Sequence, residues 1–435
     1  MDELLSLSAV AQASLIRRRE ISSEQLVRLH LARIAELNPQ INAVVQIDEA
    51  GALESARRAD SRTAAGEDVG PFHGVPFTLK DWIETTGLVC AAGMTERAGY
   101  IPKRDATVAI RMRETGAILL GKTNVLEENP VYGATRNPYD LGRSPGASSS
   151  GEAAIIAAGG SPMGLGSDSG GSLRFPAHCC GIATLKPTTG RVPLTGHYPR
   201  IGASHDPRTV IGPMSRWVED LWPMLVAISG VDQRDPSVAP VPLEPPEAGM
   251  SGRRIGWFTA MPGAQPSAET VKAVEAAVSA VSAAEATTER VELPRLEESM
   301  PLTRIYWARL QSPSWAEWLP GRSSSLTAEE IERSIFEWDR FRRTMLAFMA
   351  PFDAIICPVA EEAAPLHGKT TAQSYIYTLP FSLTGWPAAT VRAGSSGAGL
   401  PIGVQVVAKP WREADALAVA AIIESALGGW LQPAI

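Results

Sequence analysis

The chain has 435 residues, of which 45% are hydrophobic and 20% are charged, as in ordinary soluble globular proteins. Its formal net charge of −7 argues against a nucleic acid or an anionic membrane as the main partner. Four dispersed cysteines do not make a disulfide framework, and no apolar run approaches the roughly 18 residues of a membrane span. The first residues show no secretory signal, so we expect a cytoplasmic protein. A homodimer is compatible with these features.

The first half of the chain alternates helical and strand patterns. Residues 1–65 are predicted to be N-terminal helices that pack on the core, and Ser22 and Ser23 provide an N-cap for the amphipathic stretch EQLVRLHLARIAEL. Within the next segment, 66–235, short apolar runs alternate with helical stretches. The runs and stretches in chain order are 74–80, 107–116, 117–123, 151–160 and 182–188. This alternation predicts an α/β fold.

The second half begins with a Pro/Gly-rich linker over 235–252. Residues 236–350 are predicted to form a variable helical insert that walls the substrate pocket, with helices near 268–286 and 327–349. Residues 351–435 are predicted to supply C-terminal core strands and a last helix. These lie at 353–360, 401–410 and 411–427. All four segments are expected to belong to one domain.

One motif points to a different class of protein. Gly116–Thr123 fits G-x-x-x-x-G-K-[ST], the pattern of a P-loop, and a nucleotide-binding protein is therefore the non-hydrolase alternative. The four variable positions, however, are Ala-Ile-Leu-Leu, and a helical stretch precedes them where a P-loop requires a strand. We therefore favour a helix C-cap glycine followed by a buried strand.

Two Gly/Ser-rich stretches, 145–152 and 164–174, flank an apolar helical stretch and are not a solvated linker. The run Ser169-Gly170-Gly171-Ser172 would present consecutive N–H groups, which suits an oxyanion and equally a phosphate. Lys80 ends an apolar run, and burial lowers the pKa of a lysine until the neutral amine serves as a base for serine. The alternative for Lys80 is an ion pair with the adjacent Asp81.

These stretches resemble the amidase signature family of serine hydrolases. The family motif G-G-S-S-G-G-E is matched at 146–152 and G-S-D-x-G-G-S-[IL]-R at 166–174. Two more motifs are matched at 74–81 and 176–188, and PFSLTGWPAATV and GLPIGVQVVAKP resemble the family's C-terminal strands. The resemblance implies the amidase-signature fold, in which helices cover both faces of a mixed central sheet.

The resemblance also implies the roles of single residues. Ser172 would be the nucleophile, Ser148 the serine after a cis peptide bond with Ala147, and Lys80 the base. The oxyanion hole would be formed by the N–H groups of Ser169, Gly170, Gly171 and Ser172. Ala147 and Ser150 stand where the family has glycines. Asp168 and Arg174 are expected to hold the nucleophile loop without entering the chemistry.

The implied activity is hydrolysis of a linear C–N bond in a small-molecule carboxamide through a seryl acyl-enzyme, with no metal or organic cofactor. Carbamate or ester cleavage is compatible with this chemistry. The alternative within the family is the glutamine-amidase-type subunit of a tRNA-dependent amidotransferase. Tyr132, Trp307, Trp315 and Trp318 are predicted to line the substrate pocket, which favours a bulky or aryl amide. The competing interpretation is that the tryptophans, Trp338 included, pack the insert's own helices.

Histidine chemistry is not indicated. His178, six residues after Ser172, is interpreted as structural. His197 and His205 have no further ligand at a spacing typical of metal sites.

Overall fold

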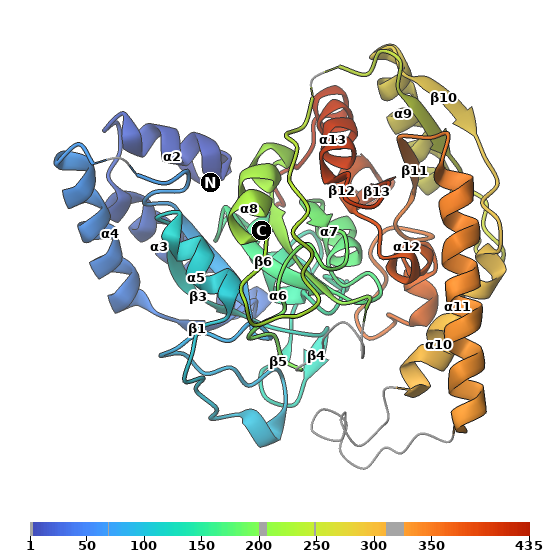
Figure 1. Ribbon diagram of the computed structural model, residues 1–435. Coiled ribbons are helices and arrows are strands. Elements are labelled where there is room, and N and C mark those ends of the chain that lie inside the picture. Colours follow the sequence, from blue (N-terminus) through green and yellow to red (C-terminus); the bar gives the residue numbers. More distant parts are fainter. Residues whose placement is uncertain (1–2, 68, 200–206, 248, 310–325) are drawn as a thin grey trace.

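The computed structural model of the protein describes residues 3–67, 69–199, 207–247, 249–309 and 326–435. Within these residues, an 11-stranded mixed sheet runs through the molecule in the order β1-β3-β2-β6-β8-β7-β12-β13-β11-β9-β10 (Figure 1). Its strands are β1 (Val44–Ile47), β2 (Pro76–Lys80), β3 (Ile118–Thr123), β6 (Met163–Asp168), β7 (Ala183–Lys186), β8 (Val210–Ser215), β9 (Arg254–Trp257), β10 (Thr287–Arg290), β11 (Ala354–Pro358), β12 (Ala388–Ser395) and β13 (Pro401–Ala408). A separate small pair is formed by β4 (Glu128–Asn129) and β5 (Gly133–Ala134).

The sheet contains both strand directions. β2 pairs in parallel with β3 and β6, and β9 pairs in parallel with β10 and β11. The remaining neighbours, from β6 through β8, β7, β12 and β13 to β11, are antiparallel, as are β1 and β3. The predicted α/β class with a mixed central sheet is therefore confirmed.

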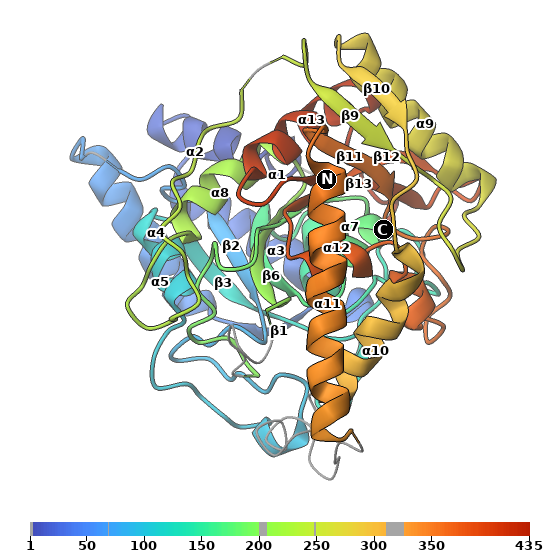
Figure 2. The same cartoon turned by 45° about the vertical axis from the view of Figure 1, so that its right-hand side comes forward.

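Helices cover both faces of the sheet (Figures 1 and 2). One hydrophobic cluster joins the sheet to α2, α5, α8, α9 and α13, a second joins it to α3, α4, α6 and α7, and a third to α10, α11 and α12. The helices are α1 (Glu3–Ser6), α2 (Ala9–Arg17), α3 (Ser23–Ile41), α4 (Glu49–Ala64), α5 (Thr107–Glu114), α6 (Ser150–Ala157), α7 (Arg174–Cys180), α8 (Leu221–Ile228), α9 (Ala268–Ala283), α10 (Ser299–Arg309), α11 (Ala328–Met349), α12 (Leu379–Thr384) and α13 (Glu413–Leu427).

The N-cap predicted from the sequence is present. The Ser22 side chain accepts a hydrogen bond from the Gln25 N–H at the start of α3. In the same part of the chain the structure differs from the prediction of helices alone, because β1 pairs with β3. Among the described residues no helix is long and apolar enough to cross a membrane.

The segment 236–350 also differs from the predicted helical insert. It does contain α9, α10 and α11, and Figure 2 shows the last two side by side. It also contains β9 and β10, which extend the central sheet beyond β11. These strands have four residues each, and most of the β10 positions are exposed. Their sequences therefore lack the long alternation that indicates a strand.

The alternation of side chains along β2 places Lys80 on the face of the sheet where the functional site lies. Phe77 and Leu79 belong to the first hydrophobic cluster. Because successive residues of a strand face opposite sides of a sheet, Thr78 and Lys80 point to the other face. That face is covered by α6, whose Glu152 accepts hydrogen bonds from Thr78 and Thr123.

Candidate active site

Lys80, at the end of β2, is fully buried. Its Nζ lies 2.7 Å from Ser148 Oγ and 3.1 Å from Ser167 Oγ, and 4.1 Å from the centre of the Trp82 ring. Burial lowers the pKa of Lys80 well below its usual value, and the negative charges of Asp168 and Glu152 only partly oppose this effect. The amine is thus held in contact with a serine hydroxyl under conditions that favour its neutral form.

The alternative for Lys80, an ion pair with Asp81, does not form. Asp81 lies against Lys122 instead, with 3.3 Å between Oδ1 and Nζ, and it accepts the Ala92 N–H at 2.8 Å. Lys122 is fully buried in β3 and also donates to the Ile83 carbonyl at 2.6 Å. The lysine of the P-loop-like motif is therefore a core ion-pair partner on a strand, and the structure contradicts the nucleotide-binding alternative.

Ser148 belongs to the loop that leads into α6, and only 6% of its surface is exposed. The peptide bond between Ala147 and Ser148 is cis, as the resemblance implies. The preceding Gly146 has φ +79°, and a Cβ there would meet the backbone of Pro176 at 2.6 Å. A glycine is thus required at this position so that the loop can pass close to α7.

Ser172 lies in the turn between β6 and α7 and is partly exposed. Its carbonyl accepts the N–H of Ser149 at 3.3 Å, which joins this turn to the loop carrying Ser148. The side chains of Lys80 and Ser148 are therefore in contact, and the Ser172 carbonyl is hydrogen-bonded to the residue that follows Ser148.

The predicted oxyanion donors are not equivalent. The N–H of Gly171 donates to Asp168 Oδ1 at 2.6 Å and is therefore already engaged. Within the described part of the chain, no acceptor takes the N–H groups of Ser169, Gly170 or Ser172. The set of four donors expected from the resemblance is thus reduced to three, because the Asp168 carboxylate occupies the fourth.

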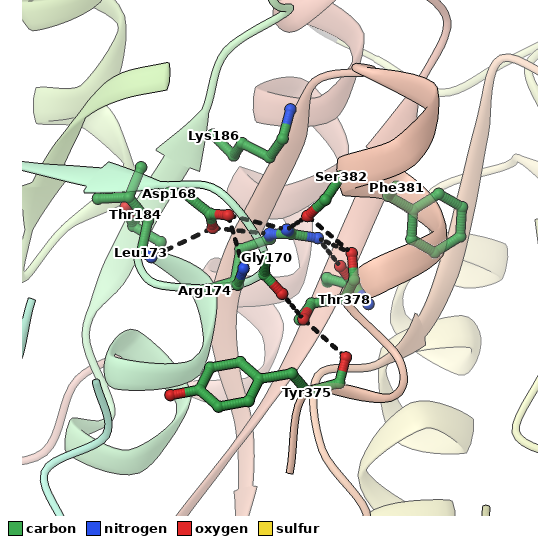
Figure 3. Close-up of polar contacts among 12 residues, drawn as sticks. Asp168, Gly170, Leu173, Arg174, Thr184, Lys186, Tyr375, Thr378, Phe381 and Ser382 are labelled. Atoms are coloured by element: carbon green, nitrogen blue, oxygen red, sulfur yellow. Dashed lines mark hydrogen bonds and ion pairs between the residues drawn. The ribbon is translucent and has the colours of Figure 1, made fainter. Parts of the chain in front are cut away.

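Asp168 and Arg174 form the buried ion pair that the sequence led us to expect (Figure 3). Arg174 Nε lies 3.0 Å from Asp168 Oδ2 and Nη2 lies 3.1 Å from Oδ1. Burial disfavours the charged form of Asp168, but Arg174 and the main-chain N–H of Leu173 outweigh it and lower the pKa of this carboxyl. The carboxylate stays ionised and anchors the turn that contains Ser172.

Of the predicted pocket residues, Trp307 lies beside this turn. It is 37% exposed, and its Cζ2 is 3.7 Å from the position that a Cβ on Gly170 would occupy. The Tyr132 hydroxyl is buried near Asp81, and burial together with that charge raises the pKa of Tyr132. Trp315 and Trp318 lie outside the described residues.

Trp338 supports the competing interpretation for the tryptophans of the insert. It is 8% exposed, belongs to the third hydrophobic cluster and donates to the Leu383 carbonyl at 2.7 Å. It therefore packs α11 against α12.

The structural interpretation of His178 agrees with the structure, whereas His205 lies outside the described residues. His178 is fully buried, accepts the Gly403 N–H at 3.0 Å and lies 2.9 Å from the Glu362 carbonyl. Both ring nitrogens are thus held by backbone groups, as expected of a structural histidine. Across the described ranges no group of three or more His, Cys, Asp or Glu side chains is placed to hold a metal ion.

Sequence reasoning did not identify Tyr375 and Thr378, which contact both catalytic loops. Tyr375 donates to the Ala147 carbonyl and Thr378 to the Gly170 carbonyl. They lie about 200 positions after Ser172 in no recognised motif, and only the fold brings them to the site.

A buried lysine bonded to a serine, beside a turn of free N–H groups, is typical of serine hydrolases that use lysine as the base. Comparison with known proteins agrees with that class. The Amidase family model matches residues 25–339 and 311–417, which together cover most of the chain. The protein therefore belongs to the amidase family and is an amide hydrolase.

Individual relatives support this assignment along the whole chain. A glutamyl-tRNA(Gln) amidotransferase subunit from Salinispora arenicola is 31% identical, with 100% of each chain covered. The structure of a 6-aminohexanoate cyclic dimer hydrolase superposes with a TM-score of 0.85 at 29% identity, covering 99% of each chain. A peptide amidase gives a TM-score of 0.82 at 26% identity, covering 98% of this chain and 99% of its own.

Proposed function

We propose that the protein cleaves a linear carboxamide through an acyl-enzyme on Ser172, with Ser148 as the proton relay and Lys80 as the base. The observation that carries this proposal is the 2.7 Å contact between Lys80 Nζ and Ser148 Oγ in surroundings that lower the lysine's pKa. A lysine that is neutral near physiological pH accepts a proton, whereas an ordinary surface lysine does not.

The reaction begins when Ser172 Oγ attacks the amide carbonyl carbon. The Ser172 proton passes to Ser148, and the Ser148 proton passes to Lys80. The C–N bond then breaks as Lys80 returns its proton through Ser148 to the departing nitrogen, because an amine anion is too poor a leaving group. A water molecule attacks the resulting ester, loses its proton through the same relay, and releases the acid as Ser172 regains a proton.

The negative charge that develops on the substrate oxygen needs donors already aimed at it. The N–H groups of Ser169, Gly170 and Ser172 are the candidates, since that of Gly171 is bound to Asp168. Fixed donors of this kind contribute more than solvent does, because they need no reorganisation during the reaction.

For the substrate, we propose a bulky, apolar or aryl carboxamide. The exposed Trp307 ring beside Gly170 offers an aromatic surface next to the proposed oxyanion donors. An aromatic wall favours aryl and large apolar groups. Carbamates (urethanes) and esters would form the same kind of acyl-enzyme and are included among the candidate substrates.

The second candidate is a glutamine-amidase subunit of a tRNA-dependent amidotransferase. The full-length similarity to the Salinispora arenicola protein favours it. However, the alignment spans 496 positions against 435 residues here, so the relative contains segments that this chain lacks. Glutaminase activity together with copurification of other subunits would support this candidate, whereas aryl amide turnover by the purified chain alone favours the first. A cytoplasmic location and a homodimer stay predictions.

The test is hydrolysis of a panel of aryl amides, aliphatic amides, carbamates and esters by the wild type and by Ser172→Ala. We expect turnover of at least the aryl amides by the wild type, and loss of turnover with an unchanged melting temperature in the variant. Ser279→Ala is the matched control, since Ser279 is a surface serine of α9 that donates only to the Glu275 carbonyl. Retained hydrolysis by Ser172→Ala would refute the nucleophile assignment.

A further inference from the structure

The segment from Tyr375 to Thr378 runs from the last residue of the short helix η5 (Ala372–Tyr375) to the residue before α12, and it touches both catalytic loops. We propose that Thr378 and Tyr375 are positioning residues that hold these loops in the geometry needed for the tetrahedral intermediate. The nucleophile turn is the turn between β6 and α7 that contains Ser172. The inference rests on the proposed function, because it assumes that the N–H groups of this turn bind the oxyanion.

Thr378 occupies the N-cap position of α12 but does not cap the helix. A threonine at this position ordinarily accepts a hydrogen bond from an N–H of the first turn. Here its hydroxyl makes no such bond, and Oγ1 lies 2.6 Å from the Gly170 carbonyl oxygen and 2.9 Å from that of Tyr375. The hydroxyl is thus diverted from its own helix toward the nucleophile turn.

The Gly170–Gly171 peptide is consequently held at both edges. Its carbonyl accepts from Thr378 at 2.6 Å, and its N–H donates to Asp168 Oδ1 at 2.6 Å. A peptide group is planar, so fixing both edges fixes the orientation of the whole unit. The free N–H groups of Gly170 and Ser172 lie on either side of this peptide, and their directions depend on it.

The fit between Gly171 and this segment is close. Gly171 has φ +137°, and a Cβ there would come within 2.8 Å of Tyr375 Cδ1 and would overlap the Thr378 hydroxyl. Only glycine adopts this conformation readily and leaves room for the threonine hydroxyl to reach the turn.

Tyr375 acts on the other loop. Its hydroxyl donates to the Ala147 carbonyl at 2.8 Å, one residue before Ser148. The ring packs on Phe175 of α7, with 4.8 Å between ring centres, so its position is fixed by the core as well. Burial raises the pKa of Tyr375, which keeps the hydroxyl protonated and able to donate.

Arg174 connects the Tyr375–Thr378 segment to Asp168, its partner in the buried ion pair (Figure 3). Its Nη1 donates to the Thr378 carbonyl at 2.9 Å and to Gln405 Oε1 at 3.1 Å, while Nε and Nη2 bind Asp168. A closed ring of contacts therefore runs from Gly170 through Thr378, Arg174 and Asp168 to Gly171. Such a ring preorganises the donors, and Thr378 and Arg174 act through it.

The test compares Thr378→Val, which removes the hydroxyl at nearly constant shape, with Thr378→Ser, which keeps it. Using the aryl amide turned over by the wild type, we expect Thr378→Val to lower kcat about 10–100-fold with KM changed less than about threefold, and Thr378→Ser to recover kcat to within about threefold. Tyr375→Phe should show the same split. Thr384→Val is the control, because Thr384 is a buried threonine of α12 that donates to Phe381 away from both loops.

Reaction with a fluorophosphonate probe separates this inference from the proposed function. A wild type that is not modified at Ser172 would overturn both. A wild type that is modified, with Thr378→Val reacting and turning over at the same rate, would overturn the positioning role alone. A loss of kcat that Thr378→Ser does not recover, or that Thr384→Val shares equally, would overturn it as well.

Discussion

Replacing Arg174 by methionine would remove the cation of a fully buried ion pair beside the nucleophile turn. Arg174 and Asp168 have no exposed side-chain surface, and Arg174 also binds the Thr378 carbonyl, Gln405 and Ser382. The variant leaves the Asp168 carboxylate buried without its cation, a change that typically costs about 3–5 kcal/mol. An unfolding entropy of about 2.1 cal/mol/K per residue gives about 0.9 kcal/mol/K for 435 residues, so we expect the melting temperature to fall by about 3–6 °C.

The same variant should change how stability depends on pH. In the wild type Arg174 helps to hold the Asp168 pKa below its unfolded value of about 3.9, so this contribution is present at pH 7 and is lost only as pH falls through the lowered pKa. Without Arg174, burial, which raises the Asp168 pKa, is opposed only by Lys186 and the main-chain N–H groups, so we expect the pKa of this carboxyl to rise. Protonation of Asp168 then removes the buried, unpaired charge of the variant as the pH falls. The difference in melting temperature between the variant and the wild type should therefore shrink from pH 8 toward pH 5.

The assay is differential scanning fluorimetry of the wild type, Arg174→Met and Asp168→Asn/Arg174→Met from about pH 5 to 8. The double variant should recover part of the loss, since it buries a neutral amide in place of a charge, and its deficit should not depend on pH. A deficit in Arg174→Met that is below about 1 °C, or constant across this range, would refute the reasoning.

Three further predictions concern catalysis and ligand choice. The kcat/KM for the aryl amide should rise with pH and level off well below pH 10.5, because burial lowers the pKa of Lys80 and only its neutral amine accepts a proton; a rise that continues past 10.5 would contradict this. Trp307→Ala should raise KM for an aryl amide about 3–10-fold and leave that of a small aliphatic amide nearly unchanged; an equal effect on both would argue against an aromatic wall. Lys122→Met should lower the melting temperature by several degrees because it strands the buried Asp81, and ATP should shift neither protein; a shift by ATP in the wild type alone would revive the nucleotide-binding alternative.

Much of the fold could be predicted from pattern alone. The Ala-rich helix expected near 268–286 is α9, the helix expected near 327–349 is α11, and the two late apolar runs are β11 and β13. These elements have strong periodicity or continuous apolar runs, which are the signals that sequence carries most clearly.

The central strand β6 shows where such reasoning fails. Gly164 and Gly166 depress the strand signal in Met163–Asp168, and no strand was predicted there. The structure explains both glycines: a Cβ on Gly164 would overlap Glu152 of α6, and one on Gly166 would lie 2.7 Å from Ser149 Oγ and Leu173 Cδ2. The residues that weaken the local signal are the ones that let the catalytic loops approach the strand.

The candidate site also has features that could be predicted from the sequence and features that could not. Lys80, Ser148 and Ser172 lie in motifs that could be recognised, and the cis bond before Ser148 was expected from them. The engagement of the Gly171 N–H by Asp168 could not be predicted, since it depends on which way a peptide faces. Nor could the approach of Tyr375 and Thr378, because a contact across some 200 residues leaves no trace in local pattern.

The measurement that tests the central claim most directly is mass spectrometry of the acyl-enzyme formed with a slowly released aryl ester or carbamate. The account predicts that the acyl group is found on the peptide that contains Ser172, and that Lys80→Met and Ser148→Ala each slow its formation by orders of magnitude near pH 7. An adduct on another residue, or full-rate acylation of Ser172 without the Lys80 amine, would contradict it.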